Sequence, residues 1–385
     1  MTGRQRGETG ALRTFLSTEL AGGAVLAAAV VVALVWANAP WSETYRDLWR
    51  RDLGPLDLRS WVNDGLMTVF FLVVALEIQR ELVTGELRER RNAALPVFAA
   101  VGGMVVPAAL YLVINGGGDG ARGWGIPMAT DIAFSLGVAA LVGRSLPSGL
   151  RVFLLALAIV DDIGAIVVIA VFYSTDVELL WLGCVAVLLV GALAARRAAV
   201  TAPLAYVVIG VAMWLALRNA GVHPTLAGVG VGLLVPSATT ASWEARLHPW
   251  TGLVVVPLFA LANAGVALSA SALDAALASP VTWGVAVGLV VGKPLGILLF
   301  SRLAVRMRVA ALPPGATWRQ LAGIGALAGI GFTVSLFVTR LAFGNGDLAD
   351  QATVGVLAAS ALATAGAALL LHSRSCGDPV PPSIP

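Results

Sequence analysis

Four ionisable side chains lie inside long apolar runs of this sequence, far from the charged segments that flank those runs. Lys293, the only lysine of the chain, stands in VTWGVAVGLVVGKPLGILL. Asp161 and Asp162 are neighbours in LLALAIVDDIGAIVVI, and Asp131 ends the run GWGIPMATD. A charge at the centre of a membrane-length segment costs roughly 2.5–3.5 kcal/mol even on lenient insertion scales. We therefore expect each of these residues to have a partner or a function.

The residue types favour the handling of protons or small cations. A desolvated lysine can lose its proton, whereas arginine, which the chain uses everywhere else, effectively cannot. Adjacent acids on a helix point about 100° apart, so one of Asp161 and Asp162 can pair with Lys293 while the other faces a cavity. Hard monovalent cations prefer oxygen ligands, which Asp162, Asp131 and Thr130 supply.

Structural roles remain open for the same residues. Lys293 could lock helices together through a buried ion pair, or extend its ammonium group to the membrane interface. If helices are broken within the bilayer, their ends carry partial charges; an acid suits an N-terminal end and a cation suits a C-terminal end. Asp131 and Lys293 fit those positions whether or not they also contact an ion.

Composition predicts a polytopic α-helical membrane protein. Of 385 residues, 58% are hydrophobic and 12% charged, and the mean hydropathy is +0.87, whereas soluble domains carry about 25% charged residues. Long apolar runs exclude a membrane β-barrel, which would show short alternating segments. The arginines are dispersed among short loops, which argues against nucleic-acid binding. Two cysteines give no disulfide framework or metal cluster, and we expect no cofactor.

Apolar segments separated by charged or Gly/Pro-rich breaks predict about twelve transmembrane helices in a single domain. We expect tails at 1–14 and 372–385 and a bundle over 15–371. Most arginines then fall on the side of the N-terminus, which places both termini in the cytoplasm. Residues 41–59 form an external cover, whose helix or hairpin nature is open. The expected spans are 15–37, 60–79, 95–114, 123–143, 150–173, 178–195, 203–217, 221–236, 248–269, 281–300, 318–341 and 352–371.

Two of these spans carry interruptions at matching places. Segment 123–143 has a proline and Asp131 at mid-depth, and segment 318–341 crowds four glycines around GIGFT. They are the middle spans of the triplets 95–173 and 281–371, which start on opposite sides of the membrane. Interrupted helices at matching positions indicate an inverted repeat with a site at mid-membrane. Glycines that only allow close helix packing are the alternative.

A second group of charges lies at expected helix ends. Glu77 and Glu81 are one helical turn apart with Arg80 on the same side, which an ordinary solvated helix end would also explain. His223 precedes a proline at an outer helix start, where its titration would suit a pH-dependent contact. Asp64 begins the span that contains Glu77, and Glu244 lies in another cytoplasmic loop.

At these residues the chain resembles the NhaA family of bacterial sodium/proton antiporters. The resemblance runs from about residue 15 to 371, and PMATDIAF with VDDIGAI is nearly sufficient to specify it. The matching stretches are WVNDGLMTVFFLVVALEIQREL (61–82), GWGIPMATDIAFSLGV (123–138), LLALAIVDDIGAIVVIAVFY (154–173), GVHPTLAGV (221–229), LHPWTGLVVVPLFALANAGV (247–266), GKPLGI (292–297) and GIGFTVSLFV (329–338).

The resemblance implies twelve helices, with two inverted repeats whose broken middle helices cross at mid-membrane. It implies that Asp161 and Asp162 bind Na⁺ or a proton, and that Asp131 and Lys293, with Thr130 beside them, balance charge at the broken helices. Lys293 would also pair with Asp161. A pH response is implied for Glu77, Arg80, Glu81, His223 and Glu244, and a place in the outer funnel for Asp64. Gln79 departs from the family, which often has lysine there, so the resemblance does not carry over a pH set-point.

The function implied is export of Na⁺ or Li⁺ in exchange for external protons, across a bacterial plasma membrane. It is expected to be pH-dependent and electrogenic, to serve Na⁺ and pH homeostasis, and to need no enzyme chemistry. A homodimer is one possibility. An intramembrane aspartyl protease also needs two buried aspartates, but on separate helices with a G-x-G-D motif that is missing here. A cation channel is opposed by Lys293, whose fixed charge would repel cations.

Overall fold

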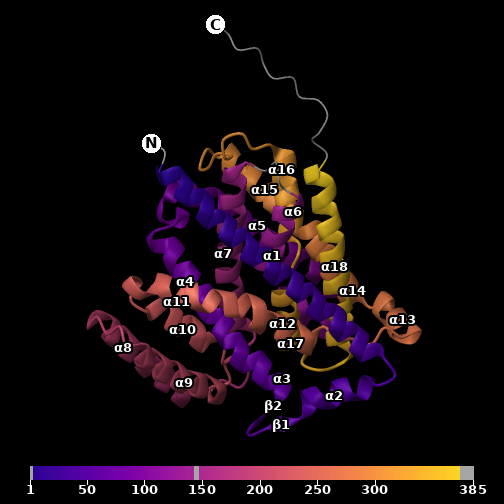
Figure 1. The fold of residues 1–385 in the computed structure, drawn as a ribbon. Coiled ribbons are helices and arrows are strands. Elements are labelled where there is room, and N and C mark those ends of the chain that lie inside the picture. Colours follow the sequence, from indigo (N-terminus) through magenta and orange to yellow (C-terminus); the bar gives the residue numbers. More distant parts are fainter. Residues whose placement is uncertain (1–2, 143–146, 373–385) are drawn as a thin grey trace.

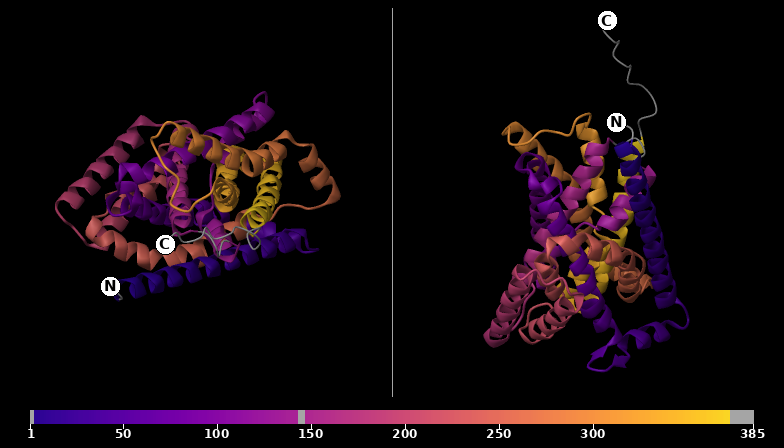
Figure 2. Two further views of the ribbon diagram at one scale, coloured as in Figure 1. Left: turned by 90° about the horizontal axis from the view of Figure 1, so that it is seen from above. Right: turned by 60° about the vertical axis from the view of Figure 1, so that its left-hand side comes forward.

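The protein is a bundle of helices with one short hairpin, described by a computed structural model over residues 3–142 and 147–372 (Figure 1). The start of α1 and the end of α18 lie at one end of the bundle, which we call the terminal end. Helix α2 and the hairpin lie at the opposite end, which we call the hairpin end (Figure 2).

The helices and strands follow the apolar runs of the sequence. In chain order they are α1 (Gly3–Asn38), α2 (Ser42–Arg50), β1 (Asp52–Leu53), β2 (Leu56–Asp57), α3 (Leu58–Ser60), α4 (Met67–Val83), α5 (Arg90–Asn115), α6 (Ile132–Val142), α7 (Ser148–Phe172), α8 (Leu179–Arg197), α9 (Pro203–Asn219), α10 (Leu226–Leu234), α11 (Ser237–Trp250), α12 (Val256–Asn263), α13 (Ala270–Ala278), α14 (Pro280–Val287), α15 (Lys293–Arg306), α16 (Trp318–Ala328), α17 (Phe332–Phe343) and α18 (Asp347–His372).

Helical turns of other pitch connect several of these helices. A 3₁₀ segment, η3 (Asp119–Met128), precedes α6, and a second, η2 (Glu86–Arg88), precedes α5. Wider π-helical turns make α4, α12 and α15 continuous with the segments before them; they are η1 (Trp61–Leu66), η4 (Thr251–Val255) and η5 (Gly288–Gly292).

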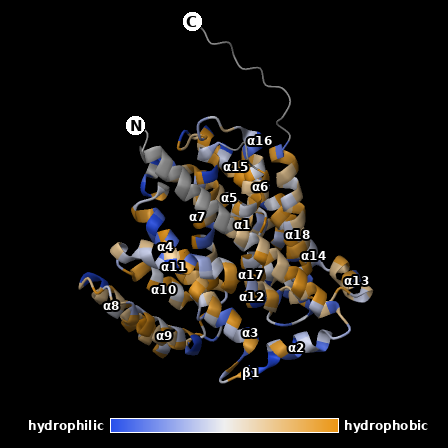
Figure 3. Cartoon of the chain, in the orientation of Figure 1, coloured by the Kyte–Doolittle hydropathy of each residue, from blue (hydrophilic) through white to orange (hydrophobic). Residues whose placement is uncertain are grey.

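Seven helical segments of the described residues are long and apolar enough to cross a membrane. The number reaches nine if two bent pairs each form one span: η3 with α6, bent by 48°, and α16 with α17, bent by 47°. Hydrophobic residues make up much of the helices (Figure 3). Many large apolar side chains are exposed, including those of Leu179 and Leu180. Such a surface suits contact with lipid, because lipid chains are as apolar as leucine.

The structure does not support all the expected spans. Helix α10, within the expected span 221–236, has nine residues and rises about 13 Å, less than half of a hydrocarbon core of about 30 Å. Helices α4 and α9 each have 17 residues. Helix α1 begins at Gly3, inside the expected tail 1–14. Apart from His372, the expected tail 372–385 lies outside the described residues.

The expected external cover contains both a helix and a hairpin. Helix α2 is followed by β1 and β2, which pair antiparallel with Leu53 opposite Leu56. Tyr45 and Trp49 on α2 are buried, and the Tyr45 hydroxyl donates to the carbonyl of Leu261 at 2.8 Å. These contacts hold α2 against the end of the bundle.

Close packing of α5 against α15 fixes the position of Lys293. Gly102 on α5 and Gly296 on α15 lie so close that a side chain at either would meet the other's carbonyl oxygen. Small residues at such contacts allow membrane helices to approach closely. Because α15 begins at Lys293, this contact sets the depth of the ammonium group in the bundle.

Candidate ion-binding site

The two breaks in the bent pairs touch each other. Residues 129–131 separate η3 from α6, and residues 329–331 separate α16 from α17. The backbone N–H of Asp131 in the first break donates to the carbonyl oxygen of Ile330 in the second at 2.8 Å. Four helix ends therefore meet inside the bundle, where their unsatisfied N–H and C=O groups need partners.

Asp131 satisfies the N-terminal ends of both following helices. Its Oδ1 accepts from the backbone N–H of Phe134 on α6 at 3.0 Å. Its Oδ2 accepts from the N–H of Thr333 on α17 at 3.2 Å and from the Thr333 hydroxyl at 2.5 Å. A carboxylate here is favourable, because the N-terminal end of a helix carries partial positive charge.

The C-terminal ends of the two preceding helices receive donors instead. The Lys293 ammonium group donates to the carbonyl of Met128, the last residue of η3. On α16, the carbonyl of Ala328 lies 3.0 Å from the Thr130 hydroxyl, and the carbonyl of Leu327 accepts from Ser135 at 2.8 Å. Acid at the N-terminal ends and cation at a C-terminal end is the arrangement that charge compensation requires.

Asp161 and Lys293 form an ion pair with no exposure to solvent. The distance from Asp161 Oδ2 to Lys293 Nζ is 2.7 Å, and both side chains have 0% exposure. The Thr130 hydroxyl also contacts Asp161 Oδ2, at 2.7 Å. Asp161 Oδ1 is buried and has no hydrogen-bond partner within the described part of the chain. One carboxylate oxygen is thus held by the pair while the other keeps its capacity to accept a proton or a cation.

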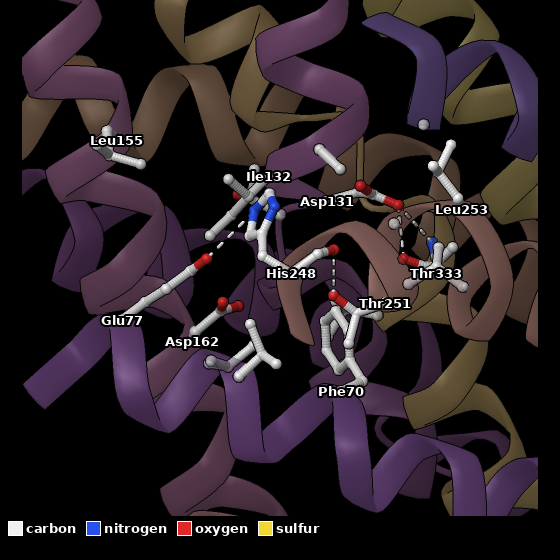
Figure 4. A pocket seen from close by; sticks show the side chains of 18 of the residues that line it. Phe70, Glu77, Asp131, Ile132, Leu155, Asp162, His248, Thr251, Leu253 and Thr333 are labelled. Carbon is white, nitrogen blue, oxygen red and sulfur yellow. Dashed lines mark hydrogen bonds and ion pairs between the residues drawn. The ribbon is translucent and has the colours of Figure 1, made fainter. Parts of the chain in front are cut away.

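Asp162 faces a separate cavity of about 70 Å³ (Figure 4). The cavity lies between α4, α7, the first break and η4, and Asp161 and Lys293 do not line it. Carboxylate and hydroxyl oxygens gather on its wall, which is the donor set that a dehydrated monovalent cation needs. The polar residues that line it are Glu77, Arg80, Thr130, Asp131, Asp162, His248, Thr251 and Thr333.

One side of this cavity is formed by linked charges on α4 and α11. Glu77 Oε1 lies 3.5 Å from His248 Nε2, and Figure 4 shows the two side chains turned toward each other. Arg80 contacts Glu244 and lies 3.4 Å from Glu81 Oε1. The structure therefore brings together four of the five residues expected in the pH response.

The fifth, His223, lies elsewhere. Its Nε2 is 3.6 Å from Asp64 Oδ1, and Asp64 Oδ2 also accepts from Arg218 at 3.1 Å. Asp64 and Glu77 are 13 positions apart along the continuous segment of η1 and α4, or about 20 Å along a helix axis. His223 thus belongs with the expected outer-funnel residue and not with the Glu77 group.

The sequence interpretation overlooked His248, although the matching stretch LHPW contains it. A histidine in front of a proline at a predicted helix start gives no signal for its partner. The pairing depends on how α11 lies across α4, which only the fold reveals. Among the described residues, no group of three or more His, Cys, Asp or Glu side chains is arranged to hold a metal ion.

Paired helix interruptions around buried charges are the architecture of secondary transporters, so the fold and the site define that class. A family model described as Na⁺/H⁺ antiporter 1 matches residues 13–371. The chain belongs to this family, whose members are transporters and not enzymes. It is a multi-pass bacterial membrane protein.

Three relatives illustrate the similarity, and each bears the name Na⁺/H⁺ antiporter NhaA. The protein of Shewanella sp. (strain ANA-3) is 47% identical over 370 residues, which cover 92% of this chain and 95% of the relative. That of Shewanella pealeana is 46% identical over 374 residues, with 92% and 95% coverage. That of Shewanella loihica is 47% identical over 367 residues, with 91% and 94% coverage.

Proposed function

We propose that this protein exchanges Na⁺ for protons across the bacterial plasma membrane, and that Asp162 carries the ion or the proton. The names of the relatives support sodium/proton exchange. One observation supports the residue assignment more than any other: Asp162 lines a cavity whose wall also includes Glu77, Asp131 and three threonines, while its neighbour Asp161 is held by Lys293. Na⁺ bound at Asp162 and a proton bound there exclude each other, which couples the two flows.

In this proposal, Asp161 contributes to the exchange through its ion pair with Lys293. When it binds a proton or contacts the cation, the pair with Lys293 breaks, and the ammonium group keeps its contact with the carbonyl of Met128. A lysine held in this way can release its proton. Two acids and a lysine allow more than one proton per Na⁺, so we propose electrogenic exchange.

The finer features of the family belong to the same proposal. Li⁺ is the second cation, because it prefers the same oxygen ligands. The terminal end faces the cytoplasm, as the distribution of arginines favours. The two bent pairs are the broken spans of an inverted repeat that crosses at mid-membrane, and α4, α9 and α10 complete an arrangement of about twelve spans. The group of Glu77, Arg80, Glu81, His248 and Glu244, together with His223 beside Asp64, makes exchange pH-dependent, and this exchange serves Na⁺ and pH homeostasis.

Reconstituted vesicles with an imposed proton gradient test the exchange. Addition of Na⁺ or Li⁺ to the outside should dissipate the gradient, whereas K⁺ should not. Clamping the membrane potential at zero with valinomycin and equal K⁺ should speed the exchange if it moves net charge. Dissipation without any added Na⁺ would indicate a proton leak or a channel, and an equal response to K⁺ would contradict the proposed substrate.

A further inference from the structure

A second cavity, of about 330 Å³, lies at the hairpin end of the molecule. It is formed by the end of α1, α2, α3, the end of α17 and the start of α18, and it shares no lining residue with the cavity at Asp162. Its size falls in the range of small-ligand sites, roughly 300–1,000 Å³. Arginines dominate its wall: Arg46, Arg50, Arg59 and Arg340 line it, together with Asp347 and Asp350.

The four arginines are arranged in two layers. Arg59 and Arg340 are half-buried, whereas Arg46 and Arg50 are exposed at the mouth. The two exposed arginines are four positions apart on α2, so their side chains lie on the same face of that helix. A group entering the cavity from solvent would contact guanidinium groups at both depths.

None of the four guanidinium groups has a carboxylate oxygen within 4.0 Å in the part of the chain that the structure describes. The partners of the inner two are neutral. Arg340 donates to the carbonyls of Asn263 at 3.0 Å and Gly344 at 3.3 Å, and Arg59 donates to the Asn345 side chain at 3.4 Å. Arg59 Nε is buried and lacks a hydrogen-bond partner among the described atoms.

The charge in this cavity is therefore incompletely compensated. Burial lowers the pKa of the Arg59 guanidinium, and the positive charge of Arg50 acts in the same direction, while Asp57 and Asp350 oppose it. Arginine nevertheless stays protonated at neutral pH. Four arginines against two aspartates leave two positive charges on the wall.

We propose that this cavity binds a phosphate group. Guanidinium groups bind phosphate through pairs of parallel hydrogen bonds, which a planar fork of donors makes possible. A bound phosphate would match the two uncompensated positive charges and give Arg59 Nε an acceptor. It would also connect α2 to α17 and α18 and so stabilise the hairpin end. Both free phosphate and the headgroup of an anionic phospholipid carry the required chemistry.

Thermal unfolding of the purified full-length protein in neutral detergent tests this site with both sources. In one arm, N-methylglucamine phosphate replaces N-methylglucamine chloride at constant ionic strength, so that Na⁺ does not contribute. In the other arm, short-chain phosphatidylglycerol is compared with phosphatidylcholine. A ligand that binds the folded state raises the unfolding temperature. We expect a rise of several degrees in at least one arm, and that arm identifies the source.

The double substitution Arg46→Gln with Arg50→Gln is the informative variant, because both side chains are exposed and their loss should leave the fold intact. It should raise the half-saturating ligand concentration about tenfold or more, since hydrogen bonds to charged groups are the strong ones. Arg51→Gln, at an exposed neighbour that does not line the cavity, should respond as the unchanged protein does. No rise in either arm, or an equal rise in the double variant and in Arg51→Gln, would overturn the proposal.

Discussion

Asp161 and Asp162 are adjacent on α7 but have different surroundings. Asp161 Oδ2 lies 2.7 Å from Lys293 Nζ and is closed off from solvent, whereas Asp162 lines the cavity between α4, α7 and η4. The angle of about 100° between successive helical side chains produces this separation. Two carboxylates of one type thus occupy sites suited to different tasks, one to an ion pair and one to an exchangeable ion.

The ion pair of Asp161 with Lys293 leads to a prediction about the thermal stability of two variants. Lys293→Ala should lower the thermal stability of the detergent-solubilised protein, because it leaves the Asp161 carboxylate buried and uncompensated, at a cost of roughly 3–5 kcal/mol. Adding Asp161→Asn to Lys293→Ala should recover part of that loss, since the uncompensated charge is removed. Unfolding of Lys293→Ala at the temperature of the unchanged protein would mean that the pair contributes no stability.

The two helix N-termini at the breaks predict a second stability effect. Asp131→Ala removes the acceptor for Phe134 and Thr333 and should destabilise the protein by about 2 kcal/mol, since each lost cap costs about 1 kcal/mol. Asp131→Asn keeps an acceptor oxygen and should cost less. Comparison of the three unfolding temperatures checks this order, and Asp131→Asn as unstable as Asp131→Ala would show that the charge and not the hydrogen bonds matters.

Gln79 gives a prediction that concerns the contact between α4 and α10. Its side-chain N–H groups donate to the carbonyls of Leu233 and Val235, both at 2.9 Å, and its oxygen accepts from Thr240. Gln79→Leu should lower the unfolding temperature, because each buried group left unsatisfied costs about 1–3 kcal/mol. Leu82→Ala, at an exposed position of the same helix, is the control and should have little effect.

Exchange assays over a range of pH give a further prediction. In the proposed mechanism protons and Na⁺ compete for Asp162. The half-saturating Na⁺ concentration should therefore rise about tenfold for each unit by which the pH falls in the acidic range, and up to twice as steeply on a logarithmic scale if both acids titrate together. The maximum rate at saturating Na⁺ should change much less. A constant half-saturating concentration with a collapsing maximum rate would instead assign the pH response to a separate group, with Glu77, Glu81, His248 and Glu244 the first to test.

Much of the architecture could be predicted from the sequence because membrane helices leave long apolar runs. The interruptions in 123–143 and 318–341 correspond to the two bent pairs, since a proline and clustered glycines disfavour a continuous helix. The length of α10 could not be predicted. Apolar composition predicts which segments are buried but not the length of each helix. The nine-residue helix α10 is held in position by its packing against α4 and α9.

The side-chain partners were less predictable than the helices. The contact of Glu77 with His248 and that of Asp64 with His223 each join residues more than a hundred positions apart. No local sequence pattern determines how α11 is rotated about its axis. The same holds for the position of the segment just before α10, which contains His223. The same reason explains why the arginine-lined cavity has no signal in the sequence.

The most direct test of the account is the transport activity of Asp162→Asn. The substitution keeps the shape of the side chain but removes its negative charge and its proton carrier. In reconstituted vesicles, with correct folding verified by thermal unfolding before reconstitution, the account predicts loss of Na⁺-dependent proton flux. Substantial Na⁺-dependent flux from this variant would contradict the assignment of Asp162 as the ion-carrying residue.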